Sequence, residues 1–260
     1  MNLRIYAKIA INGKQFFGIV DKQKKLFYVI SSSYFESNWK LTDTVIKLEK
    51  NKTIKFLPPC CPTKIVCVGL NFTDHAKELN MPLPKYPIIF LKPPSAIIGH
   101  KDKIIYPKTT KQLHYEAELA VIIKRKAKNI KPSQVKDYIL GFSCFNDVTA
   151  RDIQKKDGQW TRAKSFDTFA PVGPWIVSKE LDITNLKIQS ILNGKIMQNS
   201  STKNLIFKME YVVSFISKIM TLYPQDIITL GTPAGVGEMK RGDCITIRIE
   251  NIGELTNYVE

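Results

Sequence analysis

The stretch His114-Tyr115-Glu116-Ala117-Glu118-Leu119-Ala120-Val121-Ile122-Ile123 places two carboxylates directly before an apolar, β-branched run. Such a run predicts a buried strand. On a strand, Glu116 and Glu118 point to the same face, with their Cα atoms roughly 6–7 Å apart. Two anions that close repel each other, most strongly in an enclosed site. We therefore expect a positive charge between them, and a hard divalent cation is the simplest candidate because it takes oxygen ligands.

A third carboxylate follows a second strand-like run. Asp147 closes the segment 141–146 and would complete one face of an octahedral site together with Glu116 and Glu118. The alternative is an exposed acidic edge that lysines neutralise, because a Glu-x-Glu pair alone is a weak signal.

The composition indicates one large globular domain, or a large domain and a small one. The chain has 260 residues, 44% of them hydrophobic, and no apolar run that could span a bilayer. The first residues lack the apolar core of a signal peptide, so we expect a cytoplasmic protein with no membrane partner. The five cysteines include no Cys-x-x-Cys pair, and we expect reduced thiols.

The net charge of +16 raises the question of nucleic-acid binding. The lysines are scattered, and the densest cluster, at 124–131, lies where a hairpin or loop is expected. We interpret the charge as a solvated lysine-rich surface with no nucleic-acid partner, whose field helps to attract a small dianionic substrate. A basic binding module on a catalytically inactive scaffold is the non-enzymatic alternative.

The order of predicted elements indicates two domains. Strands are expected at 3–11, 15–20 and 26–30, and a weakly patterned, lysine-rich segment follows to about residue 57. Pro58-Pro59-Cys60-Cys61-Pro62 interrupts any regular element, so we predict a small β-rich domain at 1–60 and a larger domain at 61–260. Further strands are expected at 64–69, 86–94, 103–105, 115–124, 138–146, 173–178, 186–193, 226–230 and 244–250.

Helical periodicity is convincing only at 203–220, where Leu205, Met209 and Val212 recur at helical spacing. Many strands and few helices predict an α+β, β-rich fold and not a doubly wound one.

Eight short motifs between Lys64 and Tyr258 recur together in one known order. They are Val68–Phe72 with His75 and Glu78, Ile89–Ser95, Tyr115–Leu119, Asn146–Asp152 with Gln154, Lys164–Asp167, Gly173–Trp175, Asn193–Gly194 and Gly231–Gly237. In these motifs and their order the chain resembles the fumarylacetoacetate hydrolase family.

The resemblance implies a mixed β-roll, barrel-like catalytic domain, here 61–260, and a small β-rich N-terminal domain. It also implies a divalent metal that is usually Mg²⁺ or Mn²⁺, commonly a homodimer, and a small-molecule 2-oxo acid substrate with a second carbonyl or carboxylate.

The resemblance identifies Glu116, Glu118 and Asp147 as metal ligands. It makes His75 a general base for a water molecule, oriented by Glu78 three residues later on the same helix face. The alternative for His75 and Glu78 is an ordinary contact between two side chains on a helix surface.

Lys164, Gln154 and Arg151 would complete the catalytic group. The resemblance implies that Lys164 stabilises an oxyanion and that Gln154 hydrogen-bonds the attacked carbonyl, although Lys164 alone would pass for one more exposed lysine. Arg151 either binds a substrate carboxylate or braces the metal carboxylates.

Gly231 and Thr232 resemble a turn that offers backbone N–H groups and a hydroxyl to the substrate carboxylate. A tight structural turn is the alternative. Leu230 stands where the family usually has Thr, which would remove a hydroxyl next to that carboxylate and leave the substrate's affinity or identity open.

The expected function is hydrolysis of a carbon–carbon bond in an acylpyruvate or fumarylacetoacetate-like substrate through a metal-bound enolate. The alternatives within the family are oxaloacetate decarboxylation or tautomerisation and 2-hydroxyhepta-2,4-diene-1,7-dioate isomerisation. Decarboxylation needs no attacking water, and isomerisation needs only proton transfers. The role of residues 1–60 is left open.

Overall fold

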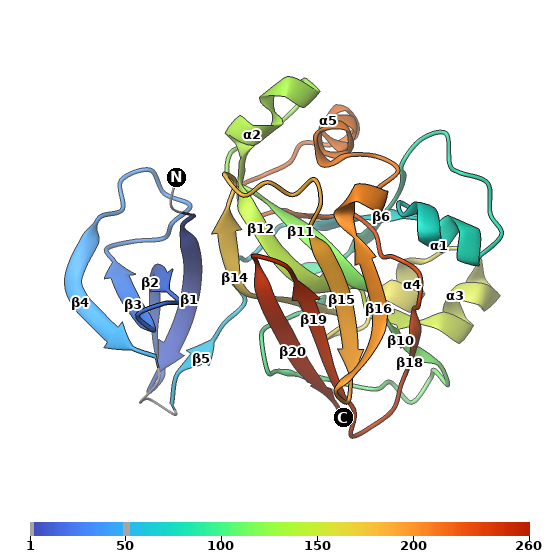
Figure 1. Ribbon diagram of the computed structural model, residues 1–260, viewed down its shortest axis with the longest axis horizontal. Coiled ribbons are helices and arrows are strands. Elements are labelled where there is room, and N and C mark those ends of the chain that lie inside the picture. Colours follow the sequence, from blue (N-terminus) through green and yellow to red (C-terminus); the bar gives the residue numbers. More distant parts are fainter. Residues whose placement is uncertain (1–2, 49–52) are drawn as a thin grey trace.

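The computed structural model describes residues 3–48 and 53–260, and most of its ordered elements are strands (Figure 1). In these ranges the largest sheet has twelve strands, ordered β4-β3-β2-β1-β14-β12-β11-β17-β6-β7, with β5 paired to β1 and β8 to β14. They are β1 (Ile5–Ile11), β2 (Lys14–Asp21), β3 (Leu26–Ile30), β4 (Leu41–Lys47), β5 (Lys55–Phe56), β6 (Ile65–Gly69), β7 (Ile88–Lys92), β8 (Ile97–Ile98), β11 (Ala117–Ile123), β12 (Ile139–Asn146), β14 (Ala170–Ser178) and β17 (Ile227–Thr229).

Two smaller sheets and short helices complete the fold. One sheet is ordered β16 (Lys195–Ser201), β15 (Lys187–Leu192), β19 (Cys244–Ile249), β20 (Gly253–Val259) and β9 (Lys103–Ile104); the other is β13 (Thr149–Ala150), β10 (Leu113–Tyr115) and β18 (Gly237–Met239). The α-helices are α1 (Thr73–Glu78), α2 (Val135–Tyr138), α3 (Arg151–Asp157), α4 (Thr161–Lys164) and α5 (Met209–Ile219). The 3₁₀ turns are Pro94–Ala96, Pro132–Gln134 and Thr202–Asn204. None of the helices in the described ranges is long and apolar enough to cross a membrane.

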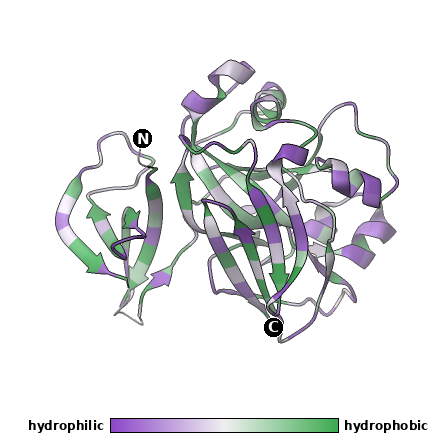
Figure 2. Ribbon diagram, viewed as in Figure 1, coloured by the Kyte–Doolittle hydropathy of each residue, from purple (hydrophilic) through white to green (hydrophobic). Residues whose placement is uncertain are grey.

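Strand β11 is buried along its whole length because both of its faces are covered. Leu119 and Val121 belong to the main core, which includes residues of the five-stranded sheet, whereas Ala120 and Ile122 face a second core. Burying each large aliphatic side chain contributes about 1.5–3 kcal/mol, so the apolar run holds the centre of the large sheet. Hydrophobic residues accordingly lie on the central strands, and hydrophilic ones on the outer helices α1 and α3 (Figure 2).

The α+β, β-rich class expected from the sequence is confirmed, and the largest sheet is open, with β4 and β7 at its ends. The helix expected at 203–220 begins only at Met209, because Thr202–Asn204 is a 3₁₀ turn and Leu205 forms a β-bridge with Phe72. The lysine-rich segment before residue 57 contains β4 and β5, which local patterning did not reveal. Strands β16 and β20 were likewise not predicted.

Strands β1–β4 form a separate lobe that joins the rest of the molecule through the large sheet (Figure 1). Strand β1 pairs antiparallel with β14 through Ile5–Val177 and Tyr6–Ile176. Trp175 packs edge-on against Phe56, with ring centroids 5.7 Å apart. The domain boundary after residue 60 stays a prediction, and the hydrogen-bonded sheet crosses between the two predicted domains.

Asp226 anchors the start of β6 beside β17. Its buried carboxylate accepts hydrogen bonds from the Thr63 backbone N–H (3.0 Å) and hydroxyl (2.7 Å) and from the backbone N–H groups of Lys64 (3.2 Å) and Tyr223 (2.8 Å). The Lys64 ammonium lies 2.5 Å away. The carboxylate therefore satisfies five donors where the chain enters the catalytic sheet.

We predict that Asp226→Asn lowers the free energy of unfolding by about 3–5 kcal/mol, because it removes a charge from a buried ion pair and turns an N–H₂ group toward donors. Urea unfolding followed by circular dichroism measures this change. Asp43→Asn, at an exposed position of β4, should change stability by less than about 0.5 kcal/mol. Equal effects of the two substitutions would contradict the anchoring role.

Candidate active site

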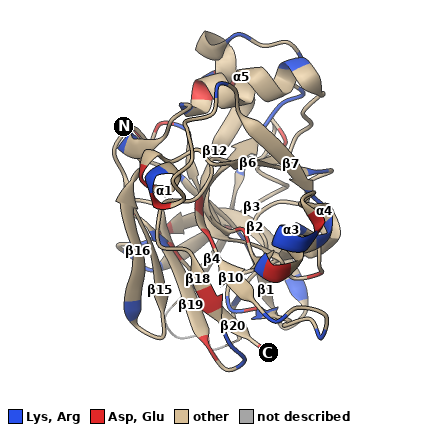
Figure 3. Cartoon of the chain, turned by 90° about the vertical axis from the view of Figure 1, so that its right-hand side faces the viewer, with Lys and Arg blue, Asp and Glu red and all other residues tan. Residues whose placement is uncertain are grey.

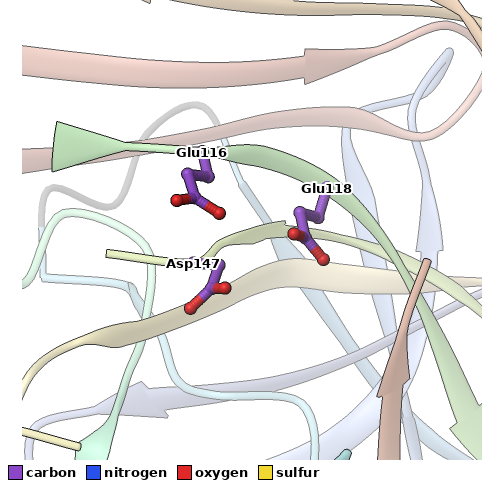
Figure 4. Close-up of side chains that lie close together, drawn as sticks. All are labelled: Glu116, Glu118 and Asp147. Atoms are coloured by element: carbon purple, nitrogen blue, oxygen red, sulfur yellow. The ribbon is translucent and has the colours of Figure 1, made fainter. Parts of the chain in front are cut away.

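Three buried carboxylates converge where β11 begins and β12 ends. Glu116 precedes β11 and Glu118 lies within it, while Asp147 directly follows Asn146, the partner of Ala117 across the β11–β12 ladder. The strand register thus brings Asp147 beside both glutamates. One oxygen from each carboxylate lies within 4.8 Å of one from each of the others, and the side chains point toward one another (Figure 4).

Two buried lysines neutralise part of this charge. The Lys92 ammonium, at the end of β7, donates to Asp147 Oδ1 (2.5 Å) and to the Val148 carbonyl (3.0 Å). The Lys164 ammonium, at the end of α4, donates to Asp147 Oδ2 (2.6 Å) and Glu116 Oε2 (3.0 Å). Lysines are rarely buried unless they are paired, so both are held by these carboxylates.

Arg151, the first residue of α3, directs its guanidinium toward protein groups. One terminal nitrogen donates to Glu116 Oε1 and the other to Gln154 Oε1 (2.5 Å), while Nε lies 3.4 Å from His114 Nδ1. Of the two roles considered from the sequence, these contacts favour bracing of a carboxylate over binding of substrate. Gln154 keeps its N–H₂ group for another partner.

The protonation of the two glutamates is set by opposite surroundings. Burial would raise the pKa of Glu116, but Lys164 and Arg151 hold it well below its usual range. Burial, followed by repulsion from Asp147 and Glu116, raises the pKa of Glu118 well above its usual range. Burial would lower the pKa of Lys164, yet Asp147 and Glu116 raise it on balance.

Glu118 is therefore the carboxylate that lacks a cation. No lysine or arginine of the described residues forms an ion pair with it, and its Oε2 accepts a hydrogen bond from the Gly231 N–H (3.1 Å). Three oxygen donors in reach of one another, one of them without a counter-charge, fit a hard divalent cation. The residues present thus match the metal site expected from the sequence.

His75 and Glu78 form a tight pair on α1. His75 Nδ1 lies 2.8 Å from Glu78 Oε2, and Glu78 Oε1 accepts the Gly235 N–H at 2.9 Å. With Nδ1 engaged by a carboxylate, Nε2 is the imidazole nitrogen left to accept or donate a proton. The pair predicted from i, i+3 spacing is therefore present and is fixed by a glycine of the turn 231–237.

A cavity of about 280 Å³ brings most of the expected residues together. One part of its lining is polar: Glu116, Glu118, Asp147, Lys164, Arg151, Gln154, Lys155, His75 and Thr232. The remaining lining is mainly apolar: Val68, Leu70, Leu79, Met81, Ile88, Phe90 and Trp160. Figure 3 looks onto the face of the molecule where α1, α3 and α4 lie. The arrangement can hold an anionic group at the polar end and an uncharged segment beside the apolar wall.

Leu230 and Gly231, both expected beside the substrate carboxylate, do not line this cavity. Leu230 is fully buried in the main core and does not line this cavity, so the exchange of Thr for Leu removes no hydroxyl from it. The Gly231 N–H, expected to face a substrate carboxylate, donates to Glu118 instead. No role was predicted for Lys92, although a charged residue that ends an apolar strand, directly before two prolines, is a usable sequence signal.

Comparison with known proteins decides the family. The sequence profile described as "Fumarylacetoacetate (FAA) hydrolase C-terminal" matches residues 64–260. The chain belongs to the fumarylacetoacetate hydrolase family.

Members of the family that resemble this chain carry several activities. Mitochondrial oxaloacetate tautomerase Fahd2a of Rattus norvegicus is 44% identical, over 79% of this chain and 69% of its own. The structure of 2-hydroxyhepta-2,4-diene-1,7-dioate isomerase from Mycobacterium marinum is 39% identical, with a TM-score of 0.89 over 99% of this chain and 98% of its own. Fumarylpyruvate hydrolase from Pseudomonas aeruginosa, in complex with Mn²⁺ and pyruvate, is 30% identical, with a TM-score of 0.71 over 75% of this chain and 88% of its own.

The raised pKa of Glu118 predicts how stability depends on pH in this family member. Because the folded pKa lies above the unfolded value of about 4.3, the unfolded state loses this proton first, and the metal-free protein becomes less stable as the pH rises from that value toward the folded pKa. Glu118→Gln should therefore raise the melting temperature in EDTA at pH 8, and the difference should shrink toward pH 5. Differential scanning fluorimetry across this range measures it.

Added Mg²⁺ or Mn²⁺ should raise the melting temperature of the unmodified protein and raise that of Glu118→Gln far less. Glu36→Gln, at an exposed position, is the matched control and should leave both responses unchanged. A Glu118→Gln protein that is less stable than the unmodified one at every pH in EDTA would show that Glu118 is not the unbalanced carboxylate.

Proposed function

We propose that this protein is a divalent-metal-dependent enzyme, using Mg²⁺ or Mn²⁺, that moves a proton between the keto and enol forms of a small 2-oxo acid. The observation that carries the proposal is the His75–Glu78 pair at the same cavity as the three carboxylates. A proton acceptor beside an electrophilic site is what enolisation needs.

The acid–base part of the reaction falls to His75. In the direction of enolisation, Nε2 takes a proton from the carbon next to the 2-oxo group, and the C–H electron pair becomes the carbon–carbon double bond of the enol. The electrons of the carbonyl double bond move to oxygen, which takes a proton back from the imidazolium, so that His75 is restored as the neutral base. Glu78, 2.8 Å from Nδ1, stabilises the imidazolium that forms. The reverse sequence converts the enol to the keto form.

Glu116, Glu118 and Asp147 would hold the metal ion. Bound there, a divalent cation supplies Lewis-acid stabilisation of the developing oxyanion. Lys92, Lys164 and Arg151 equal the three carboxylates in number, although their ion pairs reach only Glu116 and Asp147, so a bound divalent cation would give the group a net positive charge. A site with that excess suits a dianionic oxo-dicarboxylate such as oxaloacetate.

Proton transfer asks less of the site than hydrolysis does. Enolisation needs one oxyanion site, whereas hydrolysis needs a second one further along the substrate. Glu116 and Asp147 hold two of the three hydrogens of the Lys164 ammonium, which leaves one for that second site. The named activities of the tautomerase and isomerase relatives support proton transfer.

Carbon–carbon hydrolysis of an acylpyruvate or fumarylacetoacetate-like substrate is the second candidate. His75 could equally deprotonate a water molecule, and the unengaged N–H₂ group of Gln154 could receive a carbonyl. The apolar wall that includes Ile88 and Phe90 would accept an acyl segment. Oxaloacetate decarboxylation would use the same carboxylate site without a base.

We predict that His75→Ala slows oxaloacetate tautomerisation and any acylpyruvate hydrolysis by about 10²–10⁴-fold, the usual scale for a lost general acid–base group. With added Mg²⁺ or Mn²⁺, loss of enol absorbance from oxaloacetate measures tautomerisation. In separate samples, release of pyruvate from an acylpyruvate measures hydrolysis, and release of pyruvate from oxaloacetate measures decarboxylation. Metal-dependent decarboxylation should fall far less. Glu78→Ala should act in the same direction but more weakly, because it orients the base and does not replace it.

Lys77→Ala, an exposed change on the same helix, is the control and should leave all three rates unchanged. If His75→Ala keeps full tautomerase and hydrolase activity, the proposed role of the pair is wrong. If the unmodified protein hydrolyses acylpyruvates and shows no tautomerisation, the second candidate replaces the first.

We also propose a cytoplasmic homodimer, as the family resemblance implies. Multi-angle light scattering should then give about twice the chain mass of 29.6 kDa. A mass equal to that of one chain at micromolar concentration would contradict the dimer.

A further inference from the structure

Gln198 is a buried amide on an otherwise more exposed strand. It is the one fully buried residue of β16, and the ladder to β15 pairs Ser190 with Gln198 but Ile191 with Ile196. Met197 is therefore the extra residue of a β-bulge, a feature that re-aims neighbouring side chains. Here the bulge lies beside the turn 231–237, since a Cβ on Gly235 would come within 2.7 Å of the Met197 carbonyl.

The amide of Gln198 joins the metal-ligand strand to that turn. Its Oε1 accepts the backbone N–H of Ala117 (2.9 Å), the residue between the two glutamates. Its Nε2 donates to Thr232 Oγ1 (2.8 Å) and to the Pro233 carbonyl (2.8 Å). Because one end faces a donor and the other a carbonyl acceptor, the orientation of the amide is determined.

The consequence concerns the Thr232 hydroxyl. A hydroxyl that accepts a hydrogen bond from Gln198 keeps its own hydrogen for donation, and Thr232 lines the cavity beside the carboxylates. We propose that Gln198 is a positioning residue that holds Thr232 as a hydrogen-bond donor to a substrate carboxylate. The inference rests on the proposed 2-oxo acid function. It adds the residue that makes the Thr232 hydroxyl a hydrogen-bond donor, and not an acceptor, toward the substrate carboxylate.

The same contacts set the distance between the carboxylate end of a substrate and the metal ligands. Gln198 ties the turn to Ala117, and the Gly231 N–H ties it a second time, to Glu118. Two independent hydrogen bonds within the protein therefore fix the distance that a ligand between Thr232 and the carboxylates has to span. A mutation of Gln198 that keeps the acceptor for Ala117 preserves this distance and should change the hydrogen bonding of the ligand only through the Thr232 hydroxyl.

A double-mutant cycle tests this role, with oxalate and Mg²⁺ as the probe and isothermal titration calorimetry as the readout. Gln198→Glu keeps the acceptor for Ala117 but would accept the Thr232 hydrogen, so the hydroxyl would turn its lone pairs toward the ligand. It also adds a negative charge that repels oxalate, and this effect is common to both backgrounds. We therefore expect Gln198→Glu to weaken oxalate binding about 10-fold more in the unmodified protein than in a Thr232→Val background.

Gln189→Glu is the matched control, because Gln189 is also a buried amide of this sheet but bonds to Asn199. It should leave oxalate affinity unchanged. Circular dichroism checks each variant, and if Gln198→Glu does not fold, Gln198→Met takes its place in the cycle with an expected loss of about 3–10-fold.

Equal weakening in both backgrounds, or no weakening in either, would overturn the positioning role while leaving the proposed function in place. A protein that binds no oxalate with Mg²⁺ or Mn²⁺, before any substitution, would instead overturn the proposed function and this inference with it.

Discussion

The interaction on which the structure depends is the buried group of three carboxylates and three cations. Burying one unpaired ion costs several kcal/mol, so Glu116 and Asp147 can lie inside the molecule only because Lys92, Lys164 and Arg151 lie there with them. Each partner comes from a different element. The edge strand β7, the short helices α3 and α4, and the β11–β12 ladder are all positioned by this requirement.

This buried group has as many positive as negative side chains, but the ion pairs are unevenly distributed among the carboxylates. The uneven distribution is what suits the site to a metal ion. Asp147 has two ammonium partners and Glu118 has none among the residues that the structure describes, so Glu118 is the carboxylate left without a counter-charge there. A divalent cation would relieve that cost, and the turn that binds Glu118 also holds Glu78 through Gly235. The predicted metal site and the proposed acid–base pair thus share one structural support.

Local patterns predicted the parts of this site that depend on sequence spacing. The i, i+2 spacing on a predicted strand placed Glu116 and Glu118 on one face, and the i, i+3 spacing on a helix paired His75 with Glu78. Tertiary contacts decided the rest. Helix α5 starts late because the chain before it pairs with Phe72, a partner more than a hundred residues away.

Residues whose role depends on partners far away in the sequence could not be recognised from local sequence patterns. Lys92 matters because it meets Asp147, and Gln198 because a bulge turns it toward Ala117 and Thr232. Leu230 could be recognised as different from the family pattern, but only packing shows that it faces the core.

The central claim is that a divalent cation held by the carboxylate trio binds the 2-oxo acid. Crystals soaked with Mn²⁺ and pyruvate, measured near the manganese absorption edge, test it most directly. We predict one strong anomalous peak among Glu116, Glu118 and Asp147, with pyruvate oxygens at about 2.0–2.2 Å from it and a carboxylate oxygen near Thr232. An anomalous map with no peak in the trio, or pyruvate bound away from the ion, would contradict the account.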